Sequence, residues 1–199
     1  EQFCDASTGV RLCYRSHGDV HGQPLLLIAG LGLHLTSWSP LMLSSLVRRG
    51  FRVIVFDNRD VGLSTKIATQ IDLMAAVAGY LQGDPIEAPY QIADMAADAW
   101  GLLDAIGVRQ AHLFGGSMGG MIAQQMAVRH PQRVKSLTLI MTSSGARSLP
   151  PEVIAFLKSV PKDAGPMDVI RTGVSMLGLF DQATGEAANY ERALGITAK

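Results

Sequence analysis

The residues with the clearest capacity for chemistry lie at positions 114–120, which read FGGSMGG. An apolar run precedes these positions, and an amphipathic helical pattern follows them. A Gly-x-Ser-x-Gly pattern between a strand and a helix indicates a sharp turn that exposes the serine hydroxyl at the end of the sheet. The serine backbone is strained in such a turn and needs small neighbours, and the free N–H groups of the helix N-terminus point at the same place. Ser117 is therefore the candidate nucleophile, with an ordinary glycine-rich turn as the alternative.

Two further loops follow apolar runs of the kind that form buried strands. Residues 29–32 (AGLG) end the run 25–28, and residues 57–64 (DNRDVGLS) end the run 51–56. Continuous apolar runs are typical of central parallel strands that are covered on both faces. Together with the turn at Ser117, these loops stand at the ends of three predicted strands.

The elements that must position these loops alternate between strand and helix patterns. Alternating polar and apolar residues near the N-terminus predict a β-hairpin, and apolar residues at spacings of three and four predict amphipathic helices. The predicted strands cover residues 3–5, 10–16, 25–28, 51–56, 111–114 and 137–141, and the predicted helices cover residues 38–49, 91–106 and 118–130. This alternation predicts an α/β fold with an open, mostly parallel sheet and helices on both faces.

The spacing of apolar residues in the first of these helices predicts which side of it is buried. We expect the helix over residues 38–49 to turn Trp38, Leu41, Met42 and Leu46 inward, with Val47 as a further candidate.

The pattern changes after Ser143, where prolines interrupt short helical pieces. We therefore expect two units. The first is a core over residues 1–148, and the second is a helical unit over residues 149–199 that could cover the carboxyl edge of the sheet.

Charge and composition narrow the possible partners. Lys plus Arg and Asp plus Glu each total 17, so net charge gives no reason to expect nucleic acid or an anionic membrane as a partner. No apolar run approaches the length of a membrane span, and a cytoplasmic location is the expectation. No pair of His or Cys has the spacing of a metal site, and residues 30–32 lack the third glycine of a dinucleotide motif. We expect neither a metal nor a cofactor.

The two cysteines, Cys4 and Cys13, flank the predicted hairpin turn. They could form a disulfide there. Two cysteines without a secretory signal more often stay reduced.

The three loops, in this order and spacing, resemble those of the α/β-hydrolase superfamily. The motifs are GLG at residues 30–32, DNRD at residues 57–60 and GGSMG at residues 115–119. More narrowly, the chain looks like the serine-hydrolase branch that contains aclacinomycin methylesterases and enol-lactonases. The resemblance covers residues 3 to about 145, and the tail from Pro150 matches the position of that family's helical cap. A serine in the turn argues against haloalkane dehalogenases and epoxide hydrolases, which place an aspartate there.

The resemblance implies a role for three of these residues. Ser117 would attack the carbonyl of a small-molecule ester, lactone or thioester and become acylated. The backbone N–H groups of Leu31 and Met118 would then stabilise the oxyanion of the tetrahedral intermediate.

Residues around the first and second loops have supporting roles in this reading. In the family the loop at residues 57–64 is mainly structural, so we expect Asp57 and Arg59 to hold it in place, with Asp60 standing where glycine is commoner. The candidates for lining the pocket or shaping its first loop are Gly30, Gly32 and His34.

The resemblance also implies a carboxylate and a histidine base after Ser117 in the chain. His130 is the one histidine that follows, and it lies about 12 residues along a helix and so roughly 18 Å away, too far to touch the serine. We therefore expect this chain to be the N-terminal portion of a larger hydrolase, with an incomplete triad and no activity alone. The strand at residues 137–141 would then be an unprotected sheet edge through which the chain could self-associate.

Three functions fit these residues. The first is hydrolysis of a carboxylic ester through an acyl-enzyme at Ser117. The second is acyl transfer to an acceptor other than water, which the cap and the pocket would decide. The third is a binding or receptor-like module, which the incomplete triad favours for this chain alone and the intact serine turn disfavours.

Overall fold

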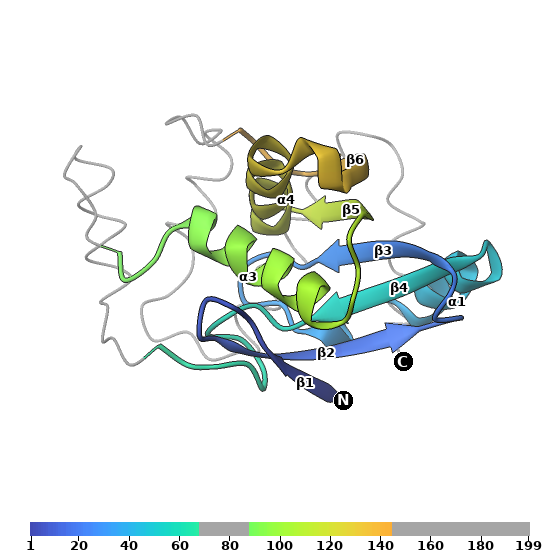
Figure 1. Ribbon diagram of the computed structural model, residues 1–199, viewed down its shortest axis with the longest axis horizontal. Helices are drawn as coiled ribbons and strands as arrows, with labels where there is room; N and C mark the ends of the chain where they lie inside the picture. Colours follow the sequence, from blue (N-terminus) through green and yellow to red (C-terminus); the bar gives the residue numbers. More distant parts are fainter. Residues whose placement is uncertain (68–87, 145–199) are drawn as a thin grey trace, which may run out of the picture. The chain divides into compact units, whose positions relative to one another are not determined.

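The computed structural model describes residues 1–67 and 88–144, and its described strands form one six-stranded sheet (Figure 1). The strands lie in the order β1-β2-β4-β3-β5-β6. The expected helical unit over residues 149–199 lies outside the described residues. The strand bounds are β1 Gln2–Asp5, β2 Arg11–His17, β3 Gln23–Ile28, β4 Phe51–Phe56, β5 Ala111–Gly116 and β6 Val134–Ile140.

The first two strands join the sheet in the antiparallel sense, and the other four run parallel. β1 pairs with β2, and β2 pairs with β4, both antiparallel. β3 lies between β4 and β5, parallel to both, and β6 runs parallel to β5. The carboxyl ends of β3, β4 and β5 therefore meet at one edge of the sheet, with the loops that follow them. The open, mostly parallel sheet expected from the sequence is confirmed.

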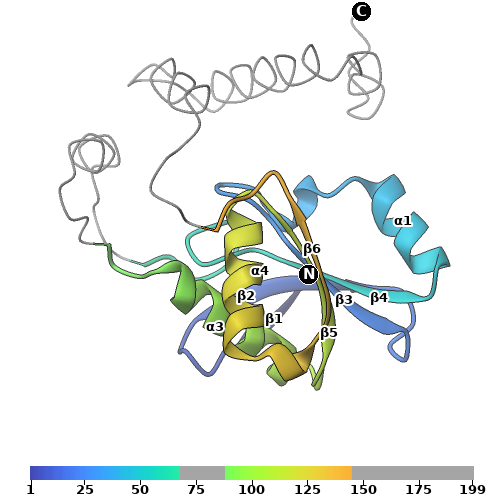
Figure 2. The ribbon, with the colours of Figure 1, turned by 90° about the horizontal axis from the view of Figure 1, so that it is seen from above.

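Helices cover both faces of this sheet, as Figure 2 shows from above. Helix α1 packs on one face, and helices α3 and α4 pack on the other. Along β3, Leu25 and Leu27 join the core on the α1 side, whereas Leu26 and Ile28 join the core on the α3 and α4 side. This explains why residues 25–28 of β3 are all apolar. The helix bounds are α1 Pro40–Arg48, α3 Ile92–Ala105 and α4 Met118–Arg129, with short 3-10 helices η1 Leu35–Ser37 and η2 Pro131–Arg133.

The predicted inner side of the first helix is wrong in one position. Leu41 is 79% exposed. The helix begins at Pro40, which suits the first helical position because its fixed backbone angle is helical and it lacks an N–H. From that start, Met42, Leu43, Leu46 and Val47 form the apolar stripe against the sheet, and Trp38 packs beside them from outside the helix. Leu41 precedes this stripe and lies on the solvent side.

The two cysteines lie on opposite faces of the hairpin. Cys4 is aligned with Leu12, and Cys13 is aligned with Phe3 on the neighbouring strand. Cys4 packs against the core on the α3 side, and Cys13 belongs to the core on the α1 side. Both are free thiols. The possible hairpin disulfide is therefore excluded, because the two side chains point away from each other.

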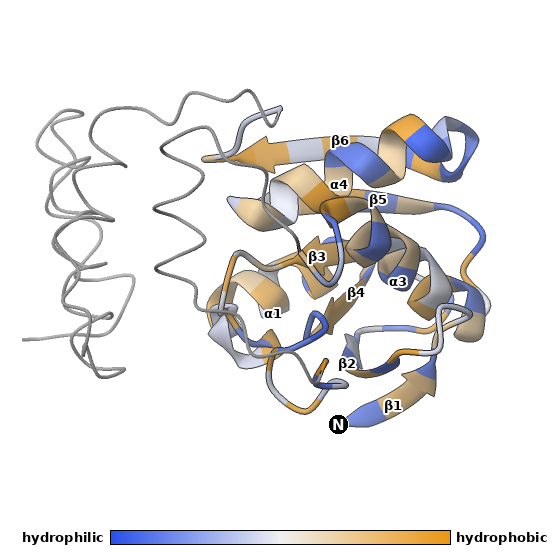
Figure 3. Ribbon diagram, turned by 90° about the vertical axis from the view of Figure 1, so that its left-hand side faces the viewer, coloured by the Kyte–Doolittle hydropathy of each residue, from blue (hydrophilic) through white to orange (hydrophobic). Residues whose placement is uncertain are grey.

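β6 forms an exposed edge of the described sheet. Its apolar residues Leu137, Leu139 and Ile140 are each more than a third exposed, and Figure 3 shows the apolar colouring of its carboxyl half. The expected unprotected edge is present among the described residues. In the part of the chain that the structure describes, no helix is long and apolar enough to cross a membrane.

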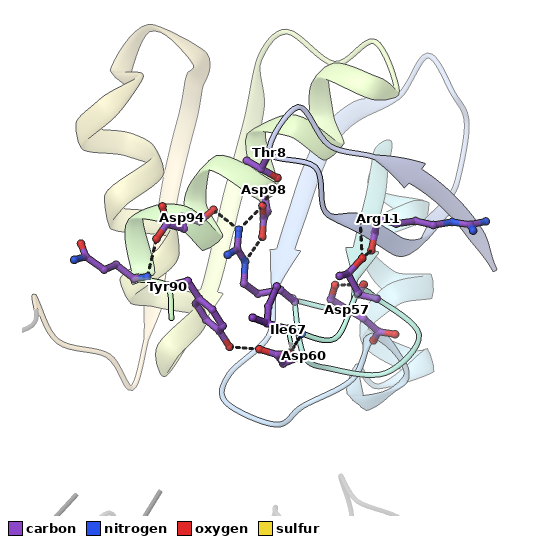
Figure 4. Close-up of polar contacts among 12 residues, drawn as sticks. Thr8, Arg11, Asp57, Asp60, Ile67, Tyr90, Asp94 and Asp98 are labelled. Carbon is purple, nitrogen blue, oxygen red and sulfur yellow. Dashed lines mark hydrogen bonds and ion pairs between the residues drawn. The ribbon is translucent and has the colours of Figure 1, made fainter. Parts of the chain in front are cut away.

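A buried ion pair joins the loop after β4 to helix α3. The Arg59 guanidinium donates two hydrogen bonds to the Asp98 carboxylate, Nε to Oδ2 at 2.6 Å and Nη2 to Oδ1 at 2.8 Å. The Thr8 hydroxyl, from the hairpin turn, donates to Asp98 Oδ1 at 2.5 Å. Arg59 is 8% exposed and Asp98 is 1% exposed. Asp98 thus holds together three segments that are far apart in the sequence: the hairpin turn, the loop after β4 and helix α3 (Figure 4).

Replacement of Asp98 by alanine should be strongly destabilising, because it leaves the Arg59 guanidinium buried without its charge partner. We expect Asp98→Ala to lower the free energy of unfolding by about 3–5 kcal/mol, measured by urea denaturation. The matched control is Asp104→Ala, which removes the 59%-exposed partner of Arg133 and should cost less than about 1 kcal/mol. Equal losses in the two variants would contradict a special role for the buried pair.

Candidate active site

Ser117 has the strained backbone that the sequence pattern predicts. It lies between the end of β5 and the start of α4, with φ +52° and ψ −124°. A residue with a side chain rarely adopts this combination, and holding it costs on the order of 1–3 kcal/mol. Ser117 therefore sits in a sharp turn at the carboxyl edge of the sheet.

The small residues around this turn are required by close approaches of the backbone. A Cβ atom on Gly119 would run into the carbonyl oxygens of Ile28 and Ala29 at the end of β3, and one on Gly115 would run into the backbone of Gly119. Gly116, in contrast, has open space where a Cβ would lie. The expected need for small neighbours holds at Gly115 and Gly119, while Gly116 has no such steric need.

The first loop lies directly beside the serine. A Cβ on Gly30 would be 3.3 Å from the Ser117 Cβ and 3.4 Å from the Gly116 carbonyl oxygen. The Leu33 N–H donates to the Gly30 carbonyl at 3.2 Å, and Gly32 has φ +70°, so the loop turns tightly here. The structure thus brings together Ser117 and the loop that carries Leu31.

Two backbone N–H groups are available beside the serine. Met118 is the first residue of α4, so its N–H has no acceptor within the helix. Among the hydrogen bonds of the described residues, none uses the N–H of Met118 or of Leu31. Free N–H groups at a helix start and in a tight loop are the donors that a developing oxyanion needs.

Asp57 connects the short helix η1, which follows the first loop, to the loop after β4. Its carboxylate accepts from the N–H of Leu35 through Oδ1 at 2.7 Å and from the N–H of Leu63 through Oδ2 at 3.0 Å. Gly62 has φ +50°, and a Cβ there would overlap the same carboxylate. Asp57 is 3% exposed and bonds to both segments, which is the structural role that the family resemblance implies.

Asp60 joins the two described ends of the stretch between β4 and α3. Its Oδ1 accepts from the Ile67 N–H at 2.6 Å, and its Oδ2 accepts from the Tyr90 hydroxyl at 2.6 Å (Figure 4). Asp60 has φ +66°, a conformation that glycine adopts without steric cost. Burial, followed by the bond to Asp60, raises the pKa of Tyr90 to about 12.

His34 does not contact Ser117 in this structure. It borders an open depression of about 250 Å³ that Leu35 and Asp57 also line, and Ser117 is not among the residues that line this depression. Its own N–H donates to Ser37 Oγ at 3.1 Å. The described hydrogen bonds include none between Ser117 and a histidine.

The other histidines lie elsewhere in the fold. His112 is at the opposite end of β5 from Ser117, between Ser136 Oγ at 2.8 Å and Gln23 Oε1 at 3.1 Å. Burial, and then the charge of Lys135, lower the pKa of His112. His130 follows the C-terminus of α4 and packs edge-on against Trp100. Within residues 1–67 and 88–144, no group of three or more His, Cys, Asp or Glu could hold a metal ion.

One contact to the serine turn was not foreseen from the sequence. Thr142, two residues after β6, donates its hydroxyl to the Ser117 carbonyl oxygen at 2.7 Å. No motif marks Thr142, and only the adjacency of β5 and β6 brings it to the turn.

Comparison with known proteins identifies the architecture. A family model described as the alpha/beta hydrolase fold matches residues 23–168. The chain is 32% identical over 168 residues to rhodomycin D methylesterase DauP of Streptomyces sp. (strain C5), covering 84% of this chain and 51% of that protein. It is 36% identical over 129 residues to the putative carbamate hydrolase RutD of Variovorax paradoxus, covering 65% of this chain and 41% of that protein. The chain thus spans about half the length of these relatives or less.

Solved structures agree with this result. A hydrolase from Pseudomonas aeruginosa PA01 is 29% identical, with a TM-score of 0.59 over 86% of this chain and 64% of that one. Est816, described as an N-acyl homoserine lactone degrading enzyme, is 28% identical, with a TM-score of 0.58 over 79% of this chain and 52% of that one.

The raised pKa of Tyr90 predicts a late titration. Protonated Tyr90 donates to Asp60, so its stabilising effect is fully present below the ordinary tyrosine pKa of about 10 and is lost as the pH rises towards about 12. The tyrosinate absorbance of the native protein minus that of Tyr90→Phe should therefore show one step near pH 12, with circular dichroism confirming that both stay folded. A step near pH 10 would show that the Asp60 contact does not hold Tyr90 protonated.

Proposed function

The chain belongs to the α/β-hydrolase family, and from that premise we propose that Ser117 cleaves a carboxylic ester, lactone or thioester through an acyl-enzyme. The observation that carries the proposal is the strained backbone of Ser117, with φ +52°, between a parallel strand and a helix N-terminus. A strained residue that the surroundings hold in place is common where chemistry occurs. A simple turn between a strand and a helix has no need of it.

In the proposed reaction, Ser117 Oγ forms a bond to the substrate carbonyl carbon and loses its proton to a base. The carbonyl oxygen becomes an oxyanion, which the N–H groups of Met118 and Leu31 stabilise. Collapse of this intermediate breaks the bond to the leaving oxygen or sulfur, which takes a proton, and leaves the acyl group on Ser117. Attack by water then releases the carboxylic acid and restores the serine.

In this proposal the chain contains the nucleophile and the oxyanion donors. None of its five histidines is proposed as the base. A serine at neutral pH needs a base within hydrogen-bond reach. The described positions of the histidines provide no such partner. The expected incomplete triad is therefore part of the proposal.

The proposed substrate is a small ester. Rhodomycin D methylesterases from two Streptomyces sources are 32% and 33% identical to this chain, and Est816 degrades N-acyl homoserine lactones. A methyl ester and a lactone are both carboxylic esters, and one nucleophile with one oxyanion site serves both. Acyl transfer to another acceptor would share the first half of the reaction and differ only in what attacks the acyl-enzyme.

One observation favours a different function for this chain alone. Because no described histidine bonds to Ser117, the chain could bind an ester-like ligand without cleaving it. The strained serine weighs against this reading, since binding alone gains nothing from backbone strain. We also propose that the protein is cytoplasmic.

We further propose that β6 mediates self-association. It presents unpaired backbone groups at the edge of the described sheet, and Leu137 and Leu139 on it are exposed. An apolar, exposed edge strand is a template for pairing with another strand.

Replacement of the nucleophile tests the main proposal. In the natural gene product, Ser117→Ala should lower kcat/KM for p-nitrophenyl acetate by at least about 1,000-fold, because no acyl-enzyme can form. The matched control is Ser44→Ala on α1, an exposed serine that donates to the Leu41 carbonyl and should leave the rate unchanged. Turnover by Ser117→Ala at the wild-type rate would refute the assignment.

A charge on the edge strand tests the association proposal. Leu139→Lys should lower the tendency to form oligomers in sedimentation velocity at several concentrations, because a lysine opposes strand pairing at an edge. Leu41→Lys, the same change on the exposed side of α1, should have no effect. The proposal fails if the unsubstituted protein is monomeric at every concentration or if the two variants form oligomers to the same extent.

A further inference from the structure

The peptide unit between Ser117 and Met118 is held from outside its own helix. Thr142 Oγ1 donates a hydrogen bond to the Ser117 carbonyl oxygen at 2.7 Å, across 25 positions of sequence. The nitrogen of this peptide unit is the Met118 N–H, one of the two proposed oxyanion donors. The hydrogen bond from Thr142 to the carbonyl therefore acts on the same peptide unit that carries the Met118 N–H.

The geometry of the peptide bond links the two sides. The unit is planar and trans, so its carbonyl and its N–H point in opposite directions. The Ser117 carbonyl also accepts from the N–H of Gly120 at 2.9 Å and of Met121 at 3.4 Å, the first bonds of α4. Among the described residues, Thr142 is the one donor to this carbonyl that comes from another element. Hydrogen bonds from α4 and from the segment after β6 thus hold the plane of the Ser117–Met118 peptide.

The segment after β6 is shaped to deliver this hydroxyl. The Ser117 N–H donates to the Ile140 carbonyl at 3.0 Å, and Met141, the next residue, has φ +47°. A positive φ at a residue with a long side chain is unusual, and such strain clusters at functional sites. The backbone turn at Met141 places the Thr142 hydroxyl within hydrogen-bond distance of the Ser117 carbonyl oxygen.

Gly120 provides the space that the threonine occupies. A Cβ on Gly120 would lie 2.6 Å from the Cβ, Cγ2 and Oγ1 atoms of Thr142. Real Cβ atoms essentially never approach that closely, so a side chain at position 120 would displace the threonine. The last glycine of the FGGSMGG run is therefore explained by Thr142 rather than by the turn itself.

We propose that Thr142 is a positioning residue for the oxyanion site. Its hydroxyl orients the Ser117–Met118 peptide, and the bond to the carbonyl polarises that peptide and makes the Met118 N–H a stronger donor. The inference rests on the proposed function of Ser117. Both the formation and the hydrolysis of the acyl-enzyme pass through an oxyanion, so the effect falls on kcat rather than on KM.

The test compares variants of Thr142 with and without the hydroxyl, in the natural gene product with p-nitrophenyl acetate. Thr142→Val keeps the shape of the side chain and removes the hydroxyl, and it should lower kcat by about 3–10-fold, the effect expected for one hydrogen bond. KM should stay within about twofold, since the contact does not touch the substrate. Thr142→Ser keeps the hydroxyl and should restore most of kcat.

Several outcomes would overturn the inference. These are an unchanged kcat in Thr142→Val, a change in KM alone, or a loss in Thr142→Ser as large as in Thr142→Val, since each would show that the hydroxyl does not act on the oxyanion step. Thr142→Ala is read in the same way if the valine variant does not fold.

Ser117→Ala in the same assay separates this inference from the proposed function. Wild-type turnover without Ser117 would refute the proposed function itself. A dead Ser117→Ala together with an unaffected Thr142→Val would refute only the role of Thr142.

Discussion

The backbone of Ser117, with φ +52° and ψ −124°, is strained, and contacts with the surrounding structure must stabilise it. The Ser117 N–H is bound to the end of β6, and its carbonyl starts α4. The first turn of α4 lies against the end of β3, an approach that only glycine at position 119 permits. The order β3-β5-β6 in a parallel sheet is therefore the condition for this turn, because it supplies a neighbour on each side.

Polar groups under the carboxyl edge then fix the loops around the serine. The Asp57 carboxylate accepts one N–H from η1 and one from its own loop, and the buried Arg59–Asp98 pair ties that loop to α3. These side chains are almost completely buried, and each is hydrogen-bonded within the fold, so their role is structural. They hold η1 and the loop after β4 in place.

Much of this arrangement is predictable because strand periodicity and turn chemistry are local. β4 begins and ends as predicted, since its residues are apolar except for Arg52 and since Gly50 and Asp57 bound it. Leu41 was misplaced because α1 begins only at Pro40, so Trp38 lies outside the helix and the buried stripe of α1 begins at Met42. The separation of Cys4 from Cys13 depends on hairpin register, and the Thr142 contact depends on which strand lies beside β5. Neither is encoded in local sequence.

The central claim is that Ser117 is an activated nucleophile, and a fluorophosphonate probe tests it most directly. Such a probe reacts with serines that a base activates, and residues 110–129 form a tryptic peptide in which Ser117 is the one hydroxyl-bearing residue. Mass spectrometry of the labelled natural gene product should find one phosphonyl group per molecule, located on this peptide. Labelling of another peptide, or no labelling of the folded protein, would contradict the account.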